Sequence, residues 1–183
     1  MFSYPYLQIE LYEACKSRDT IVFLRPGNGK HFITVMLVKF FAPKALAVEG
    51  AAQTQAPSSG SIPRSTETRK VFFLTKSVNS IRLYASVFRA HTDCRMHEHY
   101  VEDSDRGGKV PWSSEEWRSL MTTNDIHLML DATFEALLAA GFVTADHVQL
   151  LILDDVHRII VSSDGDDCYT KVVKKLRAGG LKR

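Results

Sequence analysis

The sequence of 183 residues is poor in cysteine, in net charge and in long apolar runs. Its three cysteines are odd in number and widely spaced, so they form no disulfide framework and a reducing compartment is expected. No apolar stretch approaches the roughly 20 residues that a membrane span requires, and residues 1–10 lack the pattern of a secretory signal. A net charge of +2 is too small to indicate nucleic-acid binding by itself. We therefore expect a cytoplasmic protein without membrane contact, in which any basic surface is local.

Apolar residues make up 45% of the sequence and charged residues 24%, which is an ordinary balance for one folded domain of this length. Residues 43–69 differ, because they are mostly Ala, Gly, Ser, Thr, Gln and Pro. Such a segment buries too little apolar surface to offset the entropy lost on ordering. We predict one domain, residues 1–183, with a flexible low-complexity insertion at 43–69. A second polar stretch, 102–109, predicts another surface loop.

Short apolar runs alternate with helical patterns along the rest of the chain. Each run has five or six residues, which is typical of a strand that is buried on both faces of a parallel sheet. Right-handed crossovers then place helices on both faces. The pattern predicts an α/β fold with a doubly wound parallel sheet. The predicted strands are 20–24, 71–75, 126–130 and 148–153, and the predicted helices are 7–16, 30–41, 78–90 and 132–140.

A glycine-rich turn follows the first predicted strand and precedes a helix. It contains Gly27, Asn28, Gly29 and Lys30, in the order that a phosphate-binding loop requires. Glycines let backbone N–H groups surround the anion, the lysine reaches the terminal phosphates, and the helix points its positive end at them. The next residue is His31, where a hydroxyl ligand for Mg²⁺ is usual, and imidazole is a poor ligand for that ion. A plain turn with an exposed lysine is the alternative interpretation.

Two carboxylates follow the last predicted strand. In nucleotide hydrolases an acidic residue in this place holds Mg²⁺, and its neighbour orients the attacking water. Asp154 suits the first role, but Asp155 is one methylene shorter than glutamate, and a misplacement of about 1 Å costs about a hundredfold in rate. Ligands of parallel sheets bind at the carboxyl ends of the strands, so Lys30 and Asp154 are expected to share one crevice. The sequence therefore predicts an eroded nucleotide site.

In their order and flanks, these motifs resemble those of the DExD/H-box helicases, and most closely those of the Dicer endoribonucleases. Residues 8–39 resemble the Dicer segment that runs from a glutamine motif through the phosphate loop. Three further motifs are matched in the same order by residues 71–80 (VFFLTKSVNS), 128–142 (LMLDATFEALLAAGF) and 151–157 (LILDDVH). The match covers almost the whole chain, although no motif is intact. Degenerate motifs of this kind are most like those of the arthropod Dicers that process microRNA precursors.

The resemblance implies a RecA-like P-loop NTPase fold, the first half of a helicase module, with ATP and Mg²⁺ as cofactors. It assigns Gln8 to adenine recognition and His157 to the coupling of nucleotide to RNA. The alternatives for these two residues are a surface helix residue and a helix-start residue without function. The implied nucleotide-binding residues are Gln8, Gly27, Asn28, Gly29, Lys30 and His31. The implied degenerate catalytic residues are Asp154, Asp155 and His157, with Asp154 as the metal ligand.

Three hypotheses for function follow from the resemblance. The leading one is a degenerate helicase domain that contributes to recognition of double-stranded RNA or a precursor-microRNA hairpin in RNA interference. The second is half of an active ATP-dependent RNA helicase or translocase. The third is a scaffold that binds a protein partner, for example a double-stranded-RNA-binding protein. Because the second RecA-like half and the ribonuclease III domains of a Dicer are missing, we expect a fragment of a longer chain that is inactive alone.

Histidines and tryptophans in the middle of the chain have two interpretations. Cys94, His97 and His99 suggest zinc, but no second Cys/His pair lies nearby, so we expect these histidines to be surface residues. Trp112 and Trp117 are expected to pack in the protein rather than to stack on bases.

A basic run near the end of the chain also has two interpretations. It contains Lys171, Lys174, Lys175 and Arg177, and it continues at residues 182–183. We expect a solvated helix face, with a patch that contacts RNA phosphates as the alternative.

Overall fold

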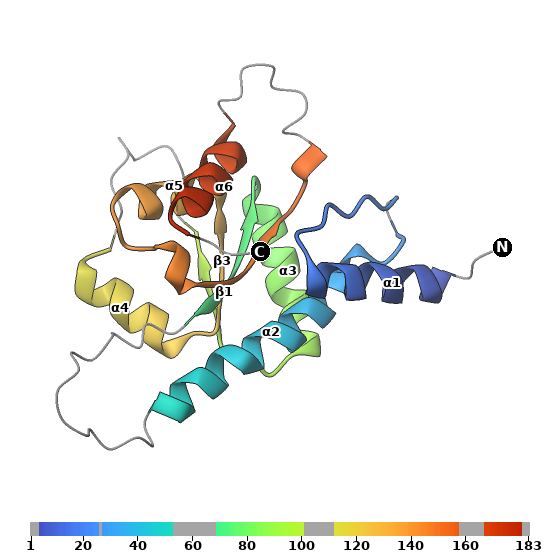
Figure 1. The fold of residues 1–183 in the computed structure, drawn as a ribbon, viewed down its shortest axis with the longest axis horizontal. Coiled ribbons are helices and arrows are strands. Elements are labelled where there is room, and N and C mark those ends of the chain that lie inside the picture. The colour runs from blue at the N-terminus through green and yellow to red at the C-terminus, as the bar shows by residue number, and fades with distance from the viewer. Residues whose placement is uncertain (1–3, 26, 53–68, 101–111, 158–166, 181–183) are drawn as a thin grey trace.

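The computed structural model describes residues 4–25, 27–52, 69–100, 112–157 and 167–180. A four-stranded sheet lies between two layers of helices, and helix α1 lies to one side of this body (Figure 1). In chain order the elements are α1 (Tyr4–Ser17), α2 (Lys30–Ala52), β1 (Lys70–Thr75), α3 (Val78–His91), β2 (Met96–His99), α4 (Ser114–Thr123), β3 (Ile126–Leu130), α5 (Asp131–Ala139), the 3₁₀ turn η2 (Ala145–His147), β4 (Val148–Leu153) and α6 (Cys168–Ala178).

The four strands are parallel and follow the order β2-β3-β1-β4. In the register, Phe72 of β1 lies opposite His127 of β3, and Leu74 of β1 lies opposite Leu153 of β4. Parallel pairing brings the carboxyl ends of the strands to one edge of the sheet, which is where ligands bind in such folds. The predicted sites are therefore expected at this edge.

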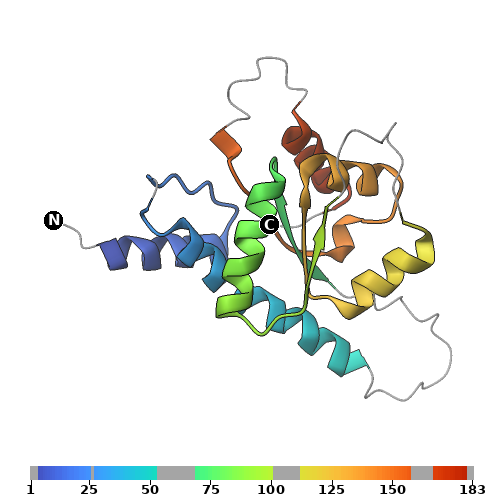
Figure 2. The same cartoon turned by 180° about the vertical axis from the view of Figure 1, so that it is seen from behind.

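The two faces of the sheet bury separate apolar cores. The ribbons in Figures 1 and 2 show the helices that cover both sides of the sheet. Because side chains alternate along a strand, Val71 and Phe73 of β1 join one core, and Phe72 and Leu74 join the other. The first core is completed by α2 and α3 through Val35, Val38, Ala42, Ile81, Tyr84, Ala85 and Phe88. The second is completed by α4, α5 and α6 through Trp117, Phe134, Leu137, Tyr169, Val172 and Leu176. The predicted α/β fold, a parallel sheet with helices on both faces, is confirmed.

Most of the predicted elements are present. The predicted strands 71–75, 126–130 and 148–153 correspond to β1, β3 and β4. The predicted helices 7–16, 78–90 and 132–140 correspond to α1, α3 and α5, and α2 begins at Lys30 as predicted. Strand β2 and helix α4 were not predicted.

The predicted strand at residues 20–24 is wrong. This segment forms neither helix nor strand, and the side chains of Ile21 and Phe23 are 83% and 85% exposed. An extended apolar run becomes a strand only where a neighbouring strand accepts and donates its backbone hydrogen bonds. Strand β4 forms the edge of the sheet, and within the described part of the chain no further strand pairs with its outer side.

The predicted loop at 43–69 is partly wrong, because α2 continues to Ala52. The sequence of this end of α2 is rich in alanine, the residue with the highest helix propensity. Residues 53–68, like the predicted loop at 102–109, lie outside the described residues. Among the described helices, α2 included, none combines the length and the apolar character needed to cross a membrane.

Candidate functional site

The predicted phosphate loop forms a tight turn at the start of α2. The Asn28 N–H donates to the carbonyl oxygen of Arg25 at 3.1 Å, which closes the turn. The Ile33 N–H donates to the carbonyl oxygen of Gly29 at 3.2 Å, which is the first hydrogen bond of the helix. The backbone N–H groups that precede this bond have no partner within the helix, so they can receive an anion.

A pocket of about 210 Å³ lies at this turn and is lined by Gly27, Gly29, Lys30 and His31. The two glycines have φ angles of 83° and 87°, in the left-handed region that favours glycine. The pocket combines a lysine ammonium group with the positive end of the α2 dipole. Its position and charge suit a phosphate group.

Gln8 of α1 closes over this loop. Its side-chain nitrogen Nε2 donates to the carbonyl oxygen of Asn28 at 3.2 Å. A methyl group added at Gly29 would lie 2.1 Å from the same nitrogen, so the Gln8 side chain would have to move to admit it. The structure thus places Gln8 at the predicted loop. We call its hydrogen bond to Asn28 the Gln8 clamp. The predicted role of Gln8 in adenine recognition stays a prediction.

Asp154 lies at the carboxyl end of β4, and charged residues of the loop influence its carboxyl group. Burial raises the pKa of its carboxyl group, and the charge of Asp155 raises it further. The Asp155 backbone N–H and the charges of Lys30 and His31 oppose this rise. The charges of the loop residues Lys30 and His31 thus reach Asp154, while the pocket itself is lined by loop residues.

Tyr84 of α3 contacts His31 of the loop and lies near the charge of Asp154, and the sequence did not predict this position. Its hydroxyl lies near enough to Asp154, Asp155 and Thr34 for these residues to influence its pKa. Its ring, which is 4% exposed, meets the His31 ring edge-on with centroids 4.9 Å apart and packs on Phe73 at 4.2 Å. Burial, followed by the nearby carboxylates, raises the pKa of the Tyr84 hydroxyl, so it remains protonated.

Asp155 has a φ angle of 55°, the only positive φ at a non-glycine among the described residues. This conformation is unfavourable for a residue with a side chain, by about 1–2 kcal/mol. Its carboxylate lies 3.9 Å from Nδ1 of His157, whose side chain is 63% exposed. The structure therefore brings these two predicted residues together, and their catalytic roles stay predictions.

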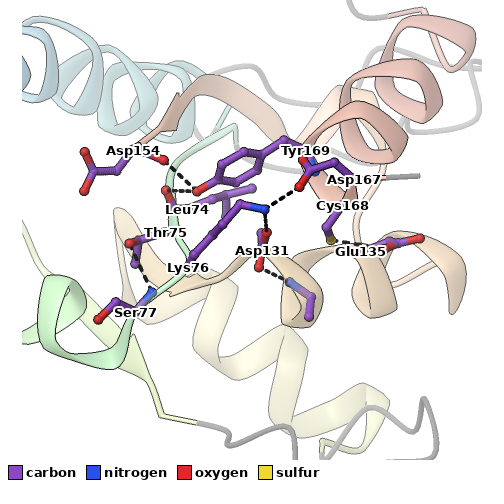
Figure 3. Close-up of polar contacts among 11 residues, drawn as sticks. Leu74, Thr75, Lys76, Ser77, Asp131, Glu135, Asp154, Asp167, Cys168 and Tyr169 are labelled. Carbon is purple, nitrogen blue, oxygen red and sulfur yellow. Dashed lines mark hydrogen bonds and ion pairs between the residues drawn. The ribbon is translucent and has the colours of Figure 1, made fainter. Parts of the chain in front are cut away.

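A second polar cluster lies at the carboxyl ends of β1 and β3 (Figure 3). Lys76, just after β1, forms ion pairs with Asp131 at the start of α5 and Asp167 at the N-cap of α6. The distance from Lys76 Nζ to Asp131 Oδ2 is 3.4 Å. The Tyr169 hydroxyl donates to the backbone oxygen of Asp154 at 2.8 Å, and Lys76 Nζ lies 4.9 Å from the centre of the Tyr169 ring. As Figure 3 shows, the Asp154 carboxylate points away from this cluster.

Charges within this second cluster neutralise one another. Burial alone would lower the pKa of Lys76, but its hydrogen bond to Asp167 and the charges of both aspartates outweigh burial and raise it. Burial raises the pKa of the Asp131 carboxyl group, and Lys76 opposes this rise. The lysine thus stays charged and held between the ends of three elements.

The histidine prediction is wrong for His99, which is 1% exposed. Its Nε2 lies 3.1 Å from Nδ1 of the fully buried His127 on the neighbouring strand. The other ring nitrogens of the pair, His99 Nδ1 and His127 Nε2, are buried without a hydrogen-bond partner in the structure. No group of three or more potential metal ligands occurs among the described residues, Cys94 and His97 included.

The two tryptophans pack as predicted. Trp117 is 4% exposed, belongs to the second core, and donates its ring N–H to the carbonyl oxygen of Phe142 at 3.0 Å. Trp112 packs against the same core and meets the His99 ring edge-on at 5.0 Å.

The basic run forms the outer face of α6. Its helix buries Tyr169, Val172 and Leu176. On the outside, Lys175 lies 3.6 Å from Glu135, and Arg177 lies 3.5 Å from Asp19. The face is exposed to solvent, which fits both interpretations of the basic run. Residues 182–183 lie outside the described residues.

Known proteins similar to this chain include several Dicers. The endoribonuclease Dicer of Xenopus tropicalis is 29% identical over 167 residues, which are 91% of this chain and 8% of that protein. The Danio rerio Dicer is 28% identical over 153 residues, 84% of this chain and 7% of that protein. The chain therefore spans less than a tenth of the length of these relatives. No protein-family model matches it. The chain is a distant homologue of Dicers.

Solved structures settle the fold. The helicase domain of Pyrococcus furiosus Hef superposes with a TM-score of 0.65 at 19% identity, over 94% of this chain and 30% of that chain. The yeast DEAD-box splicing factor Prp28 gives a TM-score of 0.55 at 16% identity, over 96% and 36% of the two chains. The fold is that of a helicase RecA-like domain. The predicted RecA-like sheet is therefore confirmed.

Proposed function

We propose that this RecA-like domain is the first half of the helicase module of a Dicer-like endoribonuclease. In this role the domain contributes to recognition of double-stranded RNA or a precursor-microRNA hairpin, without turning over ATP. The similarity to Dicers over most of the chain supports the parent protein. The altered loop and acidic motif support a relation to the arthropod Dicers that process microRNA precursors.

The observation that supports this proposal most is that the loop at Lys30 and the acidic motif at Asp154 are both altered. The loop keeps the glycines and lysine that hold phosphates, so we assign it as a phosphate site. Chemistry at such a site needs a carboxylate that orients water with an accuracy of about 1 Å. Asp155 instead has left-handed backbone and turns its short side chain toward His157. The site thus favours retention of phosphate binding over hydrolysis.

RNA recognition in this proposal relies on backbone contacts. Proteins recognise double-stranded RNA mainly through phosphates and 2′-hydroxyls, which a basic surface can contact without reading bases. Lys174 is exposed on the outer face of α6, on the side of the sheet opposite α2. We assign this face of α6 to the phosphate backbone.

The test is a hairpin-RNA titration of the purified chain at several salt concentrations. Affinity is expected to fall as salt rises, because phosphate contacts release counterions. Lys174→Glu is expected to weaken binding and to reduce the salt dependence. The matched control is Lys39→Glu, the same charge change at an exposed position of α2. Salt-independent or absent binding, or equal effects of both variants, would contradict the proposal.

An active helicase is the second candidate, because the charge of Lys30 still acts on Asp154. It predicts RNA-stimulated ATP hydrolysis by the longer protein that disappears in Lys30→Ala.

A scaffold is the third candidate, because exposed apolar residues lie around α1, namely Tyr6, Ile9, Ile21 and Phe23. It predicts a stable complex with a double-stranded-RNA-binding protein that Phe23→Lys disrupts.

A further inference from the structure

The pocket at the loop is small for the nucleotide that a helicase fold implies. Its volume is about 210 Å³, whereas sites that enclose a drug-sized ligand measure roughly 300–1,000 Å³ and have mainly apolar and aromatic walls. The described residues that line it are Gly27, Gly29, Lys30 and His31, and none of them brings an apolar side chain. The pocket therefore matches the phosphate chain of a nucleotide in size and chemistry, and these residues provide no apolar slot for a base.

The amide group of Gln8 is directed at the loop. Its nitrogen Nε2 lies 3.2 Å from the carbonyl oxygen of Asn28, which can accept a hydrogen bond only from this end of the amide. The amide also covers Gly29, because Nε2, Cδ and Oε1 lie 2.1, 2.8 and 3.4 Å from the position of an added Cβ atom. A glutamine that reads adenine uses its nitrogen and oxygen together, on N7 and N6 of the base. Here the nitrogen donates to the loop, and the oxygen lies over Gly29.

The Gln8 clamp also fixes the direction of a backbone donor in the pocket. In a trans peptide group the C=O and N–H bonds point in opposite directions within one plane. The described residues include no cis peptide bond. Because the Asn28 carbonyl oxygen points to Gln8, the Gly29 N–H of the same peptide group points away from this side chain. Gly29 lines the pocket, so its N–H can donate to a phosphate oxygen there.

We propose that the pocket binds a polyphosphate chain whatever base is attached to it, and that Gln8 is a positioning residue of the loop rather than a reader of adenine. This inference rests on the proposed phosphate site and names its class of ligand. Lys30, the Gly29 N–H and the positive end of the α2 dipole hold the phosphates, and these groups do not distinguish one base from another. Nucleoside triphosphates and inorganic triphosphate therefore share one site.

The experiment compares ATP, GTP and inorganic triphosphate, which share the phosphate chain and differ in the base. Binding to the full 183-residue chain is measured by isothermal titration calorimetry at one Mg²⁺ concentration. The dissociation constants are expected to agree within about threefold, and Lys30→Ala is expected to weaken binding of each ligand by about tenfold or more. ATP that binds about tenfold more tightly than the other two overturns the proposal, and so does inorganic triphosphate that fails to bind where nucleotides bind.

Gln8→Ala tests the positioning role, because it removes the hydrogen bond to Asn28. It is expected to weaken binding of the three ligands equally, by about three- to tenfold, since the Gly29 N–H is no longer held in one direction. A loss confined to ATP is the result of reading adenine and overturns the proposal, as does unchanged affinity for all three. The matched control is Glu10→Ala, the same truncation at an exposed position of α1. It is expected to leave all three affinities unchanged, and an effect equal to that of Gln8→Ala contradicts the positioning role.

The side-chain amide of Gln8 provides a second readout that needs no variant. Its N–H signals are followed by nitrogen–proton correlation NMR and assigned through bonds to the Gln8 backbone. Saturation with ATP, GTP or inorganic triphosphate is expected to shift these signals in the same way, because only the loop transmits binding to the amide. Signals that shift with ATP alone show contact with adenine and overturn the inference, even if Gln8→Ala does not fold.

Hairpin-RNA affinity is measured on the same samples to separate this inference from the proposed RNA recognition. Selective binding of ATP with intact RNA binding contradicts this inference alone. No binding of any of the three ligands, again with intact RNA binding, contradicts the phosphate site and this inference together. Equal binding of the three ligands without RNA binding supports the inference and contradicts the proposed RNA recognition.

Discussion

Gly29 is the loop residue whose replacement should disturb the site most. It has a left-handed backbone, and the Gln8 side chain lies where a Cβ atom would be. Gly27 also has positive φ, but nothing lies within 4 Å of its added Cβ position. We expect Gly27→Ala to lower the free energy of unfolding by about 1–2 kcal/mol through backbone strain alone. Gly29→Ala should cost more, as measured by urea unfolding.

The difference between these two variants has a specific cause that a double variant can test. In Gln8→Ala the obstructing amide is removed, so adding Gly29→Ala to it should cost only as much as Gly27→Ala does. If Gly29→Ala costs the same with and without Gln8, the clamp contributes nothing to stability.

The His99–His127 pair should make the fold sensitive to mild acid. Burial lowers the pKa of His99 to about 2, assisted by His127 and His97, and burial lowers that of His127 to about 3, assisted by Lys70 and His97. Both lie below the unfolded value of about 6.5, so the folded state binds fewer protons. The stability from the neutral pair is complete above about pH 6.5 and is lost as pH falls toward 3.

Urea unfolding between about pH 7.5 and 5.5, above the range in which carboxylates titrate, measures this loss. The free energy of unfolding should fall by up to about 1.4 kcal/mol per pH unit for each histidine. The double variant His99→Leu/His127→Leu should flatten the profile, because it removes both partners together. The exposed His91, changed to Gln, should leave the profile as it is. An equally steep profile in the double variant would contradict the buried pair.

Individual site residues differ in how far sequence can reveal them. Lys30 and Asp154 follow from their place after apolar runs, and the charge of Lys30 acts on the Asp154 carboxyl group. Tyr84 has no such signal, because an aromatic residue on a helix usually belongs to the core. It does belong to the first core, and only its packing places it beside His31 and near the Asp154 charge. His99 misled the prediction because its burial depends on strand β2, which the pattern did not indicate.

Three elements meet at Lys76, which should make this lysine important for stability. Removing it in Lys76→Met leaves Asp131 and Asp167 close together without a cation. Loss of one partner from a fully buried ion pair costs about 3–5 kcal/mol, and the 23% exposure of the Lys76 side chain reduces this. We expect a loss of about 1–2 kcal/mol in urea unfolding.

The exposed Lys174→Met on α6 is the matched control and should change the free energy of unfolding by less than about 0.5 kcal/mol. Adding Asp131→Asn and Asp167→Asn to Lys76→Met should restore most of the loss, since the unpaired charges are then gone. If it does not, the cluster stabilises the fold by packing rather than by charge.

Strands with apolar runs were predictable, whereas strands with polar residues were not. Strands β1, β3 and β4 have five or six consecutive residues of mainly apolar character. Strand β2 is Met-His-Glu-His, which has no strand pattern, and it forms because β3 lies beside it. The opposite error occurred at residues 20–24, where the pattern is strand-like and no strand of the described segments pairs with it. In both segments, strand formation depends on pairing with a strand that is distant in the sequence. A local sequence pattern does not reveal such pairing.

The open side of β4 and the exposed residues Ile21 and Phe23 should cause the isolated chain to self-associate. Edge strands of apolar sequence readily pair with other chains, and β4 is Val-Gln-Leu-Leu-Ile-Leu without a charged residue. Sedimentation at increasing concentration should show this association. The double variant Ile21→Lys/Phe23→Lys should reduce it without loss of stability, because both side chains are more than four-fifths exposed.

Leu83, an exposed apolar residue of α3, offers the matched control as Leu83→Lys. It should leave association almost unchanged. A monomer at every concentration, or an equal effect of the Leu83 variant, would contradict a role for the 20–24 segment.

The clamp of Gln8 on the loop has a practical consequence for anyone who trims this protein. Helix α1 lies beside the main body and looks dispensable (Figure 1). Yet a shortened protein that starts at Thr20 would keep every glycine and the lysine while losing the amide that holds Asn28 in place. A negative binding result from such a shortened protein would report the missing helix rather than the chemistry of the pocket.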